Sequence, residues 1–299
     1  MGQGDGVESR VETPLGSSDL YQAGVYRFRP RRLRLDPLLD NWMGPANPWG
    51  MAFDDWGQMF VVDGAGGVSC LSPGQVPAQN RLKLPRIGNP GGYCGVGYLD
   101  GGHLPDELQG TFATGDFKAN RVKVFSVSDQ GAGFKLKWEE PLLRSSHRNF
   151  RPVDVNVGPD GAIYVVDWYN SITCHQDDAY RDPRRDKAHG RIWRISSQSP
   201  ALVPPKLGGA PLLQVLDGLK SSDSWTRGQV RRELSNRDSG EVAKAMDDWL
   251  ESLDAAQEGS ERYRLEALLS CSTLELVRED LLHRVARSEI PGARALAAR

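Results

Sequence analysis

The sequence predicts two regions of different fold class, an all-β region followed by an all-α region. Three observations support this prediction. Residues 1–210 hold 28 of the 33 glycines and 17 of the 19 prolines, so turns are dense in the first region and sparse in the second. Runs with period-two alternation fill the first region, whereas apolar residues with helical spacing fill the second.

Seven alternating runs predict strands in the first region. β-Branched and aromatic residues dominate these runs, and Gly, Pro, Asp or Asn bound them, as is typical of strands joined by tight turns. No helical period precedes residue 210. The predicted strands are GVYRFRP (24–30), GMAF (50–53), QMFVVD (58–63), RVKVFSV (121–127), VDVNV (153–157), AIYVVD (162–167) and RIWRI (191–195).

An internal repeat relates two parts of the β region. NPWGMAFDDWGQMFVVD (47–63) aligns without a gap on RPVDVNVGPDGAIYVVD (151–167), and both copies predict a strand, an Asp/Gly turn, a second strand and a final Asp. A looser copy, GTFATGDFKANRVKVFSV (110–127), also places an Asp, Asp116, after a predicted strand, and Asn120 and Arg121 begin the next strand. Repeated antiparallel units of this kind predict the blades of a β-propeller.

The second region predicts short amphipathic helices. Arg recurs in WTRGQVRREL (225–234), YRLEALL (263–269) and ARALAAR (293–299), which together with the short connections indicates a HEAT-type solenoid that breaks off in its third helix pair. We expect N-caps at Ser239, Ser260 and Thr273 and first-turn prolines at Pro211 and Pro291. The apolar stripes are Val242, Ala245, Met246, Trp249, Leu250 and Leu253, then Leu274, Val277, Leu281, Leu282 and Val285.

These patterns divide the chain into four parts. A polar segment (1–21) precedes the β region (22–197), and a stretch rich in Pro, Ser and Gly (198–210) links it to the helical region (211–299). The polar N-terminus lacks the apolar core of a signal peptide, and no apolar run approaches the ~18 residues of a membrane span. As written, the sequence therefore predicts a cytoplasmic protein.

Composition excludes several classes of function. The net charge of −2 argues against a nucleic-acid binder that relies on bulk electrostatics. The four cysteines form no CxxC or haem-binding CxxCH motif, so separate thiols are expected. Cys174, His175 and His189 do not have the spacing of a zinc site. GxGxxG, P-loop and GxSxG motifs are also absent from the sequence.

Asp167 follows a predicted strand and has two interpretations. It could bind Ca²⁺ together with Asn170, since carboxylate and amide oxygens suit that ion. Alternatively, it is a structural residue, because Asp63, Asp116 and Asp167 occupy the same position in three repeated units. An Asp in this position commonly accepts hydrogen bonds from backbone N–H groups. We favour the structural interpretation because one active site does not recur in every unit.

Trp168 and Tyr169 occur only in the last copy of the repeat. Aromatic side chains just beyond a strand could stack on a ring ligand such as a sugar or a quinone. They could equally pack between neighbouring sheets. The sequence leaves these two interpretations open.

The segment HQDDAYRDPRRDKAHG (175–190) is the densest polar cluster in the chain. His189 is a candidate general base and His175 a candidate ligand-binding residue, since imidazole titrates near neutral pH. Arg185 and Arg191 could hold an oxyanion or a carboxylate. The alternative, which we favour, is an internal network of Asp–Arg ion pairs that holds a long loop in place.

Five long motifs stand out in residues 22–197. They are QAGVYRFRP, NPWGMAFDDWGQMFVVDGAGG, HLPDELQG, FRPVDVNVGPDGAIYVVDWYN and RDPRRDKAHGRIWRI. These motifs resemble one bacterial family of membrane-bound dehydrogenases, whose propeller is similar to that of quinoprotein (PQQ-type) sugar dehydrogenases. WTRGQVRREL and ARALAAR resemble the HEAT segment of the same family.

The resemblance implies a six-bladed propeller, of which the β region would supply three or four blades at about 40–50 residues each. It also implies PQQ as cofactor, Ca²⁺ as a helper, a His base with a nearby Arg, and a location in the periplasm or cell envelope. Family members usually carry an export signal, and many carry a cytochrome c module. Neither is found in this sequence, so we expect a truncated member of the family.

Three hypotheses for function follow. The first is a quinoprotein-type dehydrogenase, or a fragment of one, that oxidises a sugar or polyol. The second is a non-catalytic protein that binds a glycan, or a protein partner through the HEAT segment. The third and weakest is a Ca²⁺-dependent lactonase-like hydrolase. Fold similarity alone is a weak basis for chemistry, so the site must decide among them.

Overall fold

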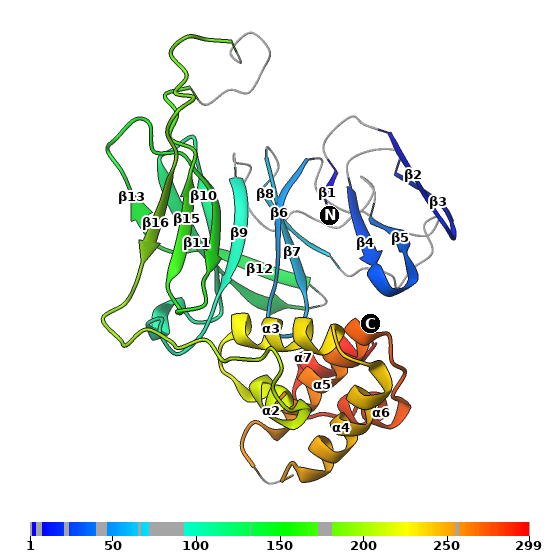
Figure 1. The fold of residues 1–299 in the computed structure, drawn as a ribbon. Helices are drawn as coiled ribbons and strands as arrows, with labels where there is room; N and C mark the ends of the chain where they lie inside the picture. Colours follow the sequence, from blue (N-terminus) through cyan, green and yellow to red (C-terminus); the bar gives the residue numbers. More distant parts are fainter. Residues whose placement is uncertain are drawn as a thin grey trace.

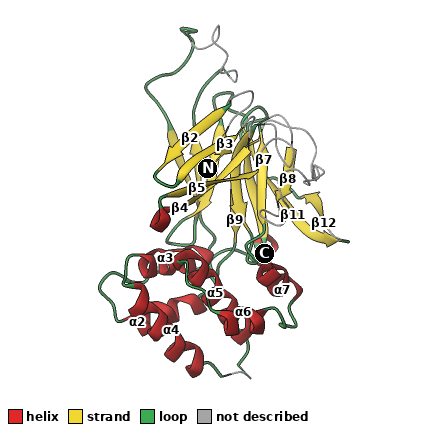
Figure 2. Cartoon of the chain, turned by 90° about the vertical axis from the view of Figure 1, so that its right-hand side faces the viewer, coloured by secondary structure: helices red, strands yellow, loops and turns green. Residues whose placement is uncertain are grey.

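The computed structural model describes residues 2–3, 8–20, 24–39, 47–64, 67–71, 93–131, 133–172, 181–254 and 257–298. Within these ranges, small antiparallel sheets form the part of the molecule up to residue 195, and six α-helices pack together beneath one end of the sheets (Figure 1). The side view in Figure 2 shows the same division into a layer of strands above a layer of helices. The predicted order of an all-β region and an all-α region is confirmed.

All paired strands are antiparallel, and most pairs join strands that are consecutive in the sequence. The strands of the sheets are β1 (Gly2–Gln3), β4 (Gly24–Arg29) and β5 (Arg34–Leu39); the hairpin β2 (Ser9–Thr13) and β3 (Gly16–Leu20); β6 (Pro48–Phe53), β7 (Met59–Asp63) and β8 (Gly67–Leu71); β9 (Tyr93–Leu99), β10 (Thr111–Asp116), β11 (Arg121–Gln130) and β12 (Gly133–Trp138), with β13 (Leu143–Arg144) paired to β11; and β14 (Pro152–Val157), β15 (Ile163–Asp167) and β16 (Arg191–Ile195).

Each of the seven predicted runs falls on a strand of the structure. The sequence did not predict the hairpin β2–β3, which lies in the segment expected to be merely polar. Its strands, SRVET and GSSDL, lack apolar alternation because the residues of β2 face mainly outward. Strands β5, β8, β9 and β12 were also missed, since glycine, proline or lysine interrupts their apolar patterns.

The internal repeat corresponds to the same local structure in both copies. The N–H of Asn47 donates to Asp63 Oδ2 at 3.1 Å, and the N–H of Arg151 donates to Asp167 Oδ1 at 2.8 Å. In each copy the first strand has a register shift after its initial proline. The tight turn of each copy holds a glycine with positive φ, 67° in the first copy and 79° in the second.

Close backbone contacts join three neighbouring sheets through their first strands, β6, β9 and β14. A Cβ atom at Gly50 would collide with the backbone of Gly95, and one at Gly97 with that of Val155. Only glycine permits this approach. Apolar side chains fill the remaining space between sheets. The first of these cores holds Ala52, Phe60, Val62, Val68, Cys70, Tyr93, Val96, Phe112 and Phe125, and the second holds Leu99, Leu104, Ala113, Val122, Phe150, Val155, Ile163 and Val165.

The helices share one apolar core that includes Leu216, Val230, Trp249 and Leu265. Residues expected as N-caps lie just inside the helices: Asp238 caps the helix that begins at Ser239, and Gly259 precedes Ser260. The helices are α2 (Leu212–Asp217), α3 (Ser224–Ser235), α4 (Ser239–Ser252), α5 (Ser260–Leu274), α6 (Glu279–Val285) and α7 (Pro291–Ala298). HEAT-type stacking of these helices stays a prediction. Among the described helices, none has the length and apolar content that a membrane span requires.

The prediction that the apolar residues from Leu274 to Val285 form one continuous helical stripe was wrong. The helix α5 ends at Leu274, and Glu275 adopts a left-handed conformation with φ of 58° that stops the helix. Val277, expected on the buried face, is almost fully exposed between the helices, and α6 begins only at Glu279. Thr273, expected as an N-cap, therefore lies in the last turn of α5.

The expected linker, residues 198–210, contains no helix or strand, and the sheets hold part of it in place. The carbonyl of Pro200 lies 3.0 Å from Nδ1 of the buried His103, and the N–H of Leu202 donates to the carbonyl of Asp160. This segment is therefore packed against the β14–β16 sheet and its neighbour.

A buried ionic cluster joins the sheets to the helices, with Arg227 of α3 at its centre. This side chain is 2% exposed, and its Nη2 lies 2.7 Å from Asp55 in the β6–β7 turn and 3.3 Å from Asp100 just after β9. Its Nε lies 2.9 Å from Glu266 of α5, although the N–H is not aligned with that oxygen, so the contact is an ion pair and not a hydrogen bond. One guanidinium thus meets carboxylates from both regions.

Further side chains complete the cluster. Arg262 lies 2.6 Å from Asp55, and Arg231 pairs with Glu266. The Tyr98 hydroxyl donates to Asp55 at 3.1 Å, and burial raises the pKa of this phenol, so it stays protonated. These contacts compensate the cost of removing the charges from water.

Replacing the central cation should weaken the whole fold. We expect Arg227→Met to lower the free energy of unfolding by about 3–5 kcal/mol, because buried carboxylates lose their partner. Urea unfolding followed by circular dichroism measures this change. The exposed Arg232 of the same helix provides the control, and Arg232→Met should stay within about 0.5 kcal/mol of the parent. Equal stability of both variants would show that the cluster is dispensable.

Asp100 should make stability depend on pH. Burial raises the pKa of its carboxyl from 3.8 to about 6, assisted by Asp55 and Asp223, although Ser224 and Arg227 act in the opposite direction. Between these pKa values the folded chain holds a proton that the unfolded chain has lost, so this contribution is present below pH 4 and is lost as the pH rises through 6.

The Asp100→Asn variant isolates this effect. The stability of the parent relative to the variant should fall by on the order of 3 kcal/mol between pH 4 and pH 7. Urea unfolding at closely spaced pH values gives the difference. A difference that is flat over this range, or that rises with pH, would contradict the assignment.

Candidate functional site

The loop between β15 and β16 forms the candidate site. It projects from the end of its sheet that lies away from the helices (Figures 1 and 2). Residues 168–172 and 181–190 of this loop are described, and we call them the β15–β16 loop. Cys174 and His175, the latter a predicted ligand-binding residue, lie outside the described residues.

Asp167 anchors the base of the loop. Its side chain is buried and accepts three hydrogen bonds, from the N–H of Arg151 at 2.8 Å, the N–H of Tyr169 at 2.9 Å and the indole N–H of Trp193 at 3.0 Å. Both carboxylate oxygens therefore face hydrogen atoms of the protein. The contacts hold the first strand, the loop and the last strand of the sheet together.

Asp63 and Asp116 occupy related positions in the two preceding sheets. Asp63 accepts from the N–H of Asn47, as its repeat partner Asp167 does from Arg151. Asp116 instead accepts from Ala119 N–H at 3.2 Å and from Arg121 Nε at 2.9 Å, so it closes the turn that follows its strand. In all three sheets the carboxylate binds N–H groups.

Asn170 is buried and its polar atoms are also engaged. Its Oδ1 accepts from the N–H of Ile172 at 3.2 Å, and its Nδ2 donates to the carbonyl of Asp186 at 3.3 Å. The predicted calcium ligands Asp167 and Asn170 thus point their oxygens at N–H donors, and a cation at the same place would repel these donors. The part of the chain that the structure describes contains no group of three or more His, Cys, Asp or Glu residues arranged to hold a metal ion. Calcium does not fit this pair.

Tyr169 is the centre of a stack of side chains. The His147 ring lies parallel to it, with 5.7 Å between centroids, and the Arg191 guanidinium lies 3.8 Å from its centroid. His189 approaches edge-on at 6.3 Å. The backbone φ of Tyr169, 50°, is strained for a bulky residue, and the Asp167 contact to its N–H stabilises this conformation. The Tyr169 ring is therefore packed within the loop.

Trp168 lies differently from its neighbour. It is partly exposed, and the nearest cation, the Arg185 guanidinium, is 5.4 Å from its ring centroid. Of the two predicted stacking residues, Trp168 offers more open surface to a ligand. Arg185 and Arg191, the two predicted anion-binding residues, thus each lie over an aromatic ring of the loop.

Asp186 and His189 form a carboxylate–imidazole pair. Nδ1 of His189 lies 2.8 Å and 3.0 Å from the two carboxylate oxygens of Asp186. The N–H of Ala188 and the side chain of His189 lower the pKa of Asp186, so the carboxylate stays ionised at neutral pH. Nδ1 therefore carries the hydrogen, and Nε2 belongs to a side chain that is 70% exposed. This geometry suits a general base.

The predicted network of Asp–Arg pairs is present in one half of the loop. Asp182 binds Arg184 with 2.6 Å between Oδ2 and Nη2, and this contact lowers the pKa of Asp182 to about 2. Asp186 pairs with His189 instead of an arginine. Within the described ranges, Arg191 has no carboxylate partner, since its guanidinium lies over Tyr169 and Trp193.

Sequence reasoning missed two residues of this site. Asp186 was considered only as a partner for arginine, although its position three residues before His189 allows a turn that joins the two side chains. His147 belongs to no motif, and nothing in its local sequence reveals that it stacks on Tyr169. A second loop, which precedes β14, brings His147 into place.

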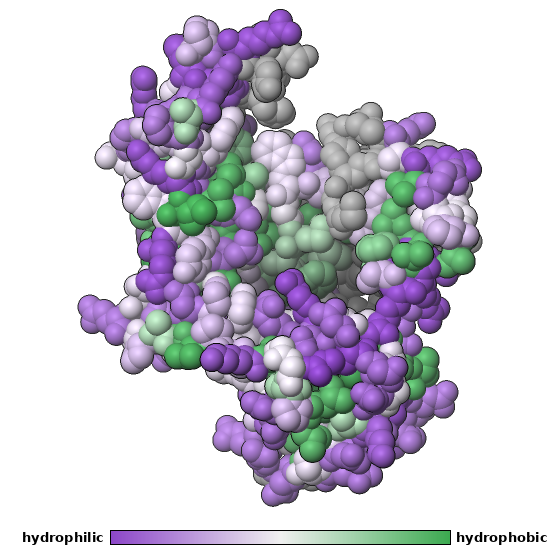
Figure 3. Space-filling view, in the orientation of Figure 1, coloured by the Kyte–Doolittle hydropathy of each residue, from purple (hydrophilic) through white to green (hydrophobic). Residues whose placement is uncertain are grey.

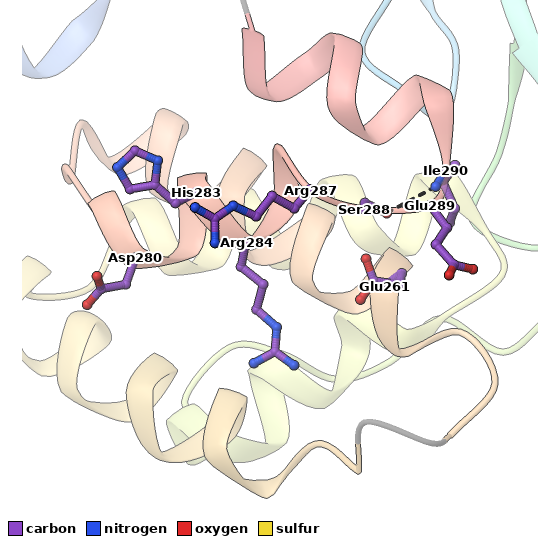
Figure 4. A pocket seen from close by; sticks show the side chains of 8 residues that line it. All are labelled: Glu261, Asp280, His283, Arg284, Arg287, Ser288, Glu289 and Ile290. Carbon is purple, nitrogen blue, oxygen red and sulfur yellow. Dashed lines mark hydrogen bonds between the residues drawn. The ribbon is translucent and has the colours of Figure 1, made fainter.

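A hollow lies elsewhere, among the helices. Its volume is about 860 Å³, and its lining comes from α5, α6 and the turn before α7 (Figure 4). Arg284 points into the hollow and His283 lies towards its edge. Because carboxylates and guanidinium groups alternate around it, the hollow favours neither cations nor anions. The lining residues are Glu261, Asp280, His283, Arg284, Arg287, Ser288, Glu289 and Ile290.

Comparison with known proteins gives one family match. The sequence profile of a family described as a domain of unknown function, DUF7133, matches residues 68–199. This span includes strands β9 to β16 and the β15–β16 loop. A search of curated proteins found no matching sequence.

Several solved structures of sugar dehydrogenases are similar in part. The soluble aldose sugar dehydrogenase from Escherichia coli, in the apo form, has 21% identity over 40% of this chain and 41% of its own, with a TM-score of 0.32. A glucose dehydrogenase from Thermus thermophilus has 17% identity over 50% of this chain and 45% of its own, with a TM-score of 0.34. The chain thus spans less than half the length of these structures.

Asp167 should contribute to stability through its three N–H contacts. We expect Asp167→Asn to lower the free energy of unfolding by about 2 kcal/mol, because the amide turns a donor towards N–H groups that need an acceptor. Urea unfolding gives the value. The control is Asp129→Asn at an exposed position of β11, where little change is expected.

Calcium provides an independent test of the same carboxylate. We expect millimolar CaCl₂ or excess EDTA to leave the midpoint of thermal unfolding unchanged. A saturable rise of this midpoint with CaCl₂ that Asp167→Asn abolishes would overturn the structural role given to Asp167.

Proposed function

We propose that this chain serves in the oxidation of a sugar or polyol hydroxyl, as part of a quinoprotein-type dehydrogenase, with His189 as the general base. The observation that carries the proposal is the pairing of the His189 imidazole with the Asp186 carboxylate on an exposed loop. Arg191 lies beside it, with its guanidinium over Tyr169. A base oriented by a carboxylate and accompanied by a cation is what proton removal from a hydroxyl requires.

The chemistry of the pair follows from its hydrogen bonding. Asp186 holds the imidazole in the tautomer that presents Nε2 as the acceptor, and it stabilises the imidazolium that forms when Nε2 takes the hydroxyl proton. The carbon that carried the hydroxyl becomes a carbonyl by losing its hydrogen as a hydride to an acceptor. When bound, PQQ would be that acceptor, by the resemblance described above.

The residues present fit part of this cofactor. PQQ carries carboxylates, which the guanidinium groups of Arg185 and Arg191 could bind, and the partly exposed ring of Trp168 could support a planar group. Calcium, which the resemblance also implies, does not fit Asp167 and Asn170. No step is therefore assigned to calcium.

We further propose that the sheets are blades of a six-bladed propeller. The equivalent hydrogen bonds of the two repeat copies and the contacts among β6, β9 and β14 support this proposal. Equivalent residues of the two repeat copies differ in exposure, as expected when one sheet is covered by the next sheet and the other is not. Val62 is fully buried by the next sheet, whereas the equivalent Val166 is 39% exposed. The outer face of the β14–β16 sheet could thus receive a further blade.

Two alternatives remain as hypotheses. A non-catalytic glycan-binding protein would use the partly exposed Trp168 but would not require the Asp186–His189 pair. Calcium-dependent hydrolysis lacks support in the described ranges, where Asp167 and Asn170 already bind N–H groups. Binding of a protein partner by the helical region also stays a prediction.

Removal of the base tests the proposal. With PQQ added, we expect the protein to reduce a redox dye in the presence of one or more members of a sugar and polyol panel. His189→Gln should lower kcat/KM by about 100-fold or more, because a positioned base typically contributes this much. Asp186→Asn should also lower kcat and alter its pH profile, since it removes the charge that stabilises the imidazolium.

His283→Gln is the matched control, because His283 is an exposed histidine on α6, in the other region of the chain. Its activity should equal that of the parent. Unchanged turnover in His189→Gln would exclude this residue as the base. A complete absence of dye reduction across the panel, in protein that is folded and loaded with PQQ, would favour the non-catalytic alternative.

A further inference from the structure

We propose that the candidate site takes an anionic sugar, one that carries a carboxylate or sulfate group, in preference to a neutral sugar. This inference rests on the proposed function, because it names the substrate class of the same site. The surface that carries it is a set of cations around the β15–β16 loop, which we call the basic rim and define as Arg148, Arg181 and Lys187.

The two segments that build the site are basic, although the chain as a whole has a net charge of −2. Residues 144–151 contain three arginines and no acid. Residues 171–194 contain six basic and four acidic residues, and this count includes Asp177 and Asp178, which lie outside the described residues. The upper left of Figure 3, where the loop projects, is correspondingly hydrophilic.

Many of these charges already have partners within the chain. Arg184 binds Asp182, Arg194 binds Asp160, and Arg144 lies 3.3 Å from Glu140. Arg151 is buried, and its guanidinium donates to the carbonyls of Phe117 and Asn170. These four arginines therefore already have partners within the fold.

The basic rim is different. Arg148, Arg181 and Lys187 are exposed, and within the described ranges no carboxylate pairs with any of them. Exposed cations without internal partners cost the fold little, but they attract anions and raise their local concentration.

The fold places part of the rim beside the proposed base. Arg148 follows His147, whose ring stacks on Tyr169, and Lys187 lies between Asp186 and His189 in the sequence. The N–H of Asn170 donates to the carbonyl of Asn149 at 3.0 Å, which ties the two loops together. A ligand whose hydroxyl binds Nε2 of His189 would therefore lie on the loop that carries Lys187 and beside the loop that carries Arg148.

This arrangement discriminates between classes of sugar. A neutral sugar gains nothing from unpaired cations, whereas a uronate or sulfated sugar gains charge-assisted hydrogen bonds and faster association. The carboxylates of PQQ share this chemistry, but Arg185 and Arg191, which lie over the aromatic rings, are the residues assigned to the cofactor. The rim is left for the substrate.

Binding of an acidic oligosaccharide to the full chain tests the proposal. By isothermal titration calorimetry at low salt, trigalacturonate should bind at least about tenfold more tightly than the neutral galactotriose, and this preference should shrink at high salt. The triple variant Arg148→Gln, Arg181→Gln, Lys187→Gln should lose the preference. The control triple Lys206→Gln, Arg232→Gln, Lys244→Gln removes three exposed cations elsewhere and should bind as the parent does.

The arms of the experiment separate the possible failures. Trigalacturonate binding must persist with PQQ added; if PQQ displaces it, the rim holds the cofactor and the proposal fails. It also fails if neither sugar binds, if both bind equally, or if the rim variant equals the parent. His189→Gln should keep the preference for trigalacturonate. If the protein shows this preference but oxidises no sugar, only the proposed function is rejected. If it oxidises neutral sugars in a His189-dependent way but lacks the preference, only the present inference is rejected.

Discussion

The ionic cluster around Arg227 is the interaction on which the arrangement of this protein depends. A guanidinium that is 2% exposed requires carboxylates, and these come from the β6–β7 turn, from the end of β9 and from α5. Neither region can satisfy these charges alone, because Asp55 and Asp100 belong to the sheets and Glu266 belongs to the helices. The helices are thereby held against one end of the sheets, and the β15–β16 loop projects from the opposite end (Figure 1).

The repeated sheet unit explains where that site forms. In two copies of the repeat the final Asp binds the N–H group that begins the first strand, so the unit closes in the same way. Glycines then allow the first strands of neighbouring sheets to approach closely. The last copy differs because a long loop follows its Asp, and the hydrogen bonds of Asp167 to the backbone of Tyr169 and to Trp193 hold the base of that loop.

The chemistry of the loop depends on which acid pairs with which donor. Asp167 and Asn170 face N–H groups, so their oxygens maintain structure and do not attract a cation. Asp186 turns back on His189 and leaves one imidazole nitrogen exposed. Tyr169 is held in a strained conformation and positions Arg191 near this imidazole. The same short segment thus separates acids that bind backbone and indole N–H groups from one acid that pairs with an imidazole.

The sequence by itself determined the order of the two fold classes, the seven alternating strands and the gap-free repeat, because each depends on local spacing of apolar and turn residues. It also singled out His189, Arg191 and the structural role of Asp167. Only the tertiary structure decided that Asp186 orients His189, that His147 stacks on Tyr169, and that Arg227 joins two regions. Those contacts link residues through backbone conformation or across distant segments, so no local pattern records them. The break after Leu274 shows the same limit, since the left-handed Glu275 interrupts an apolar period that looked continuous.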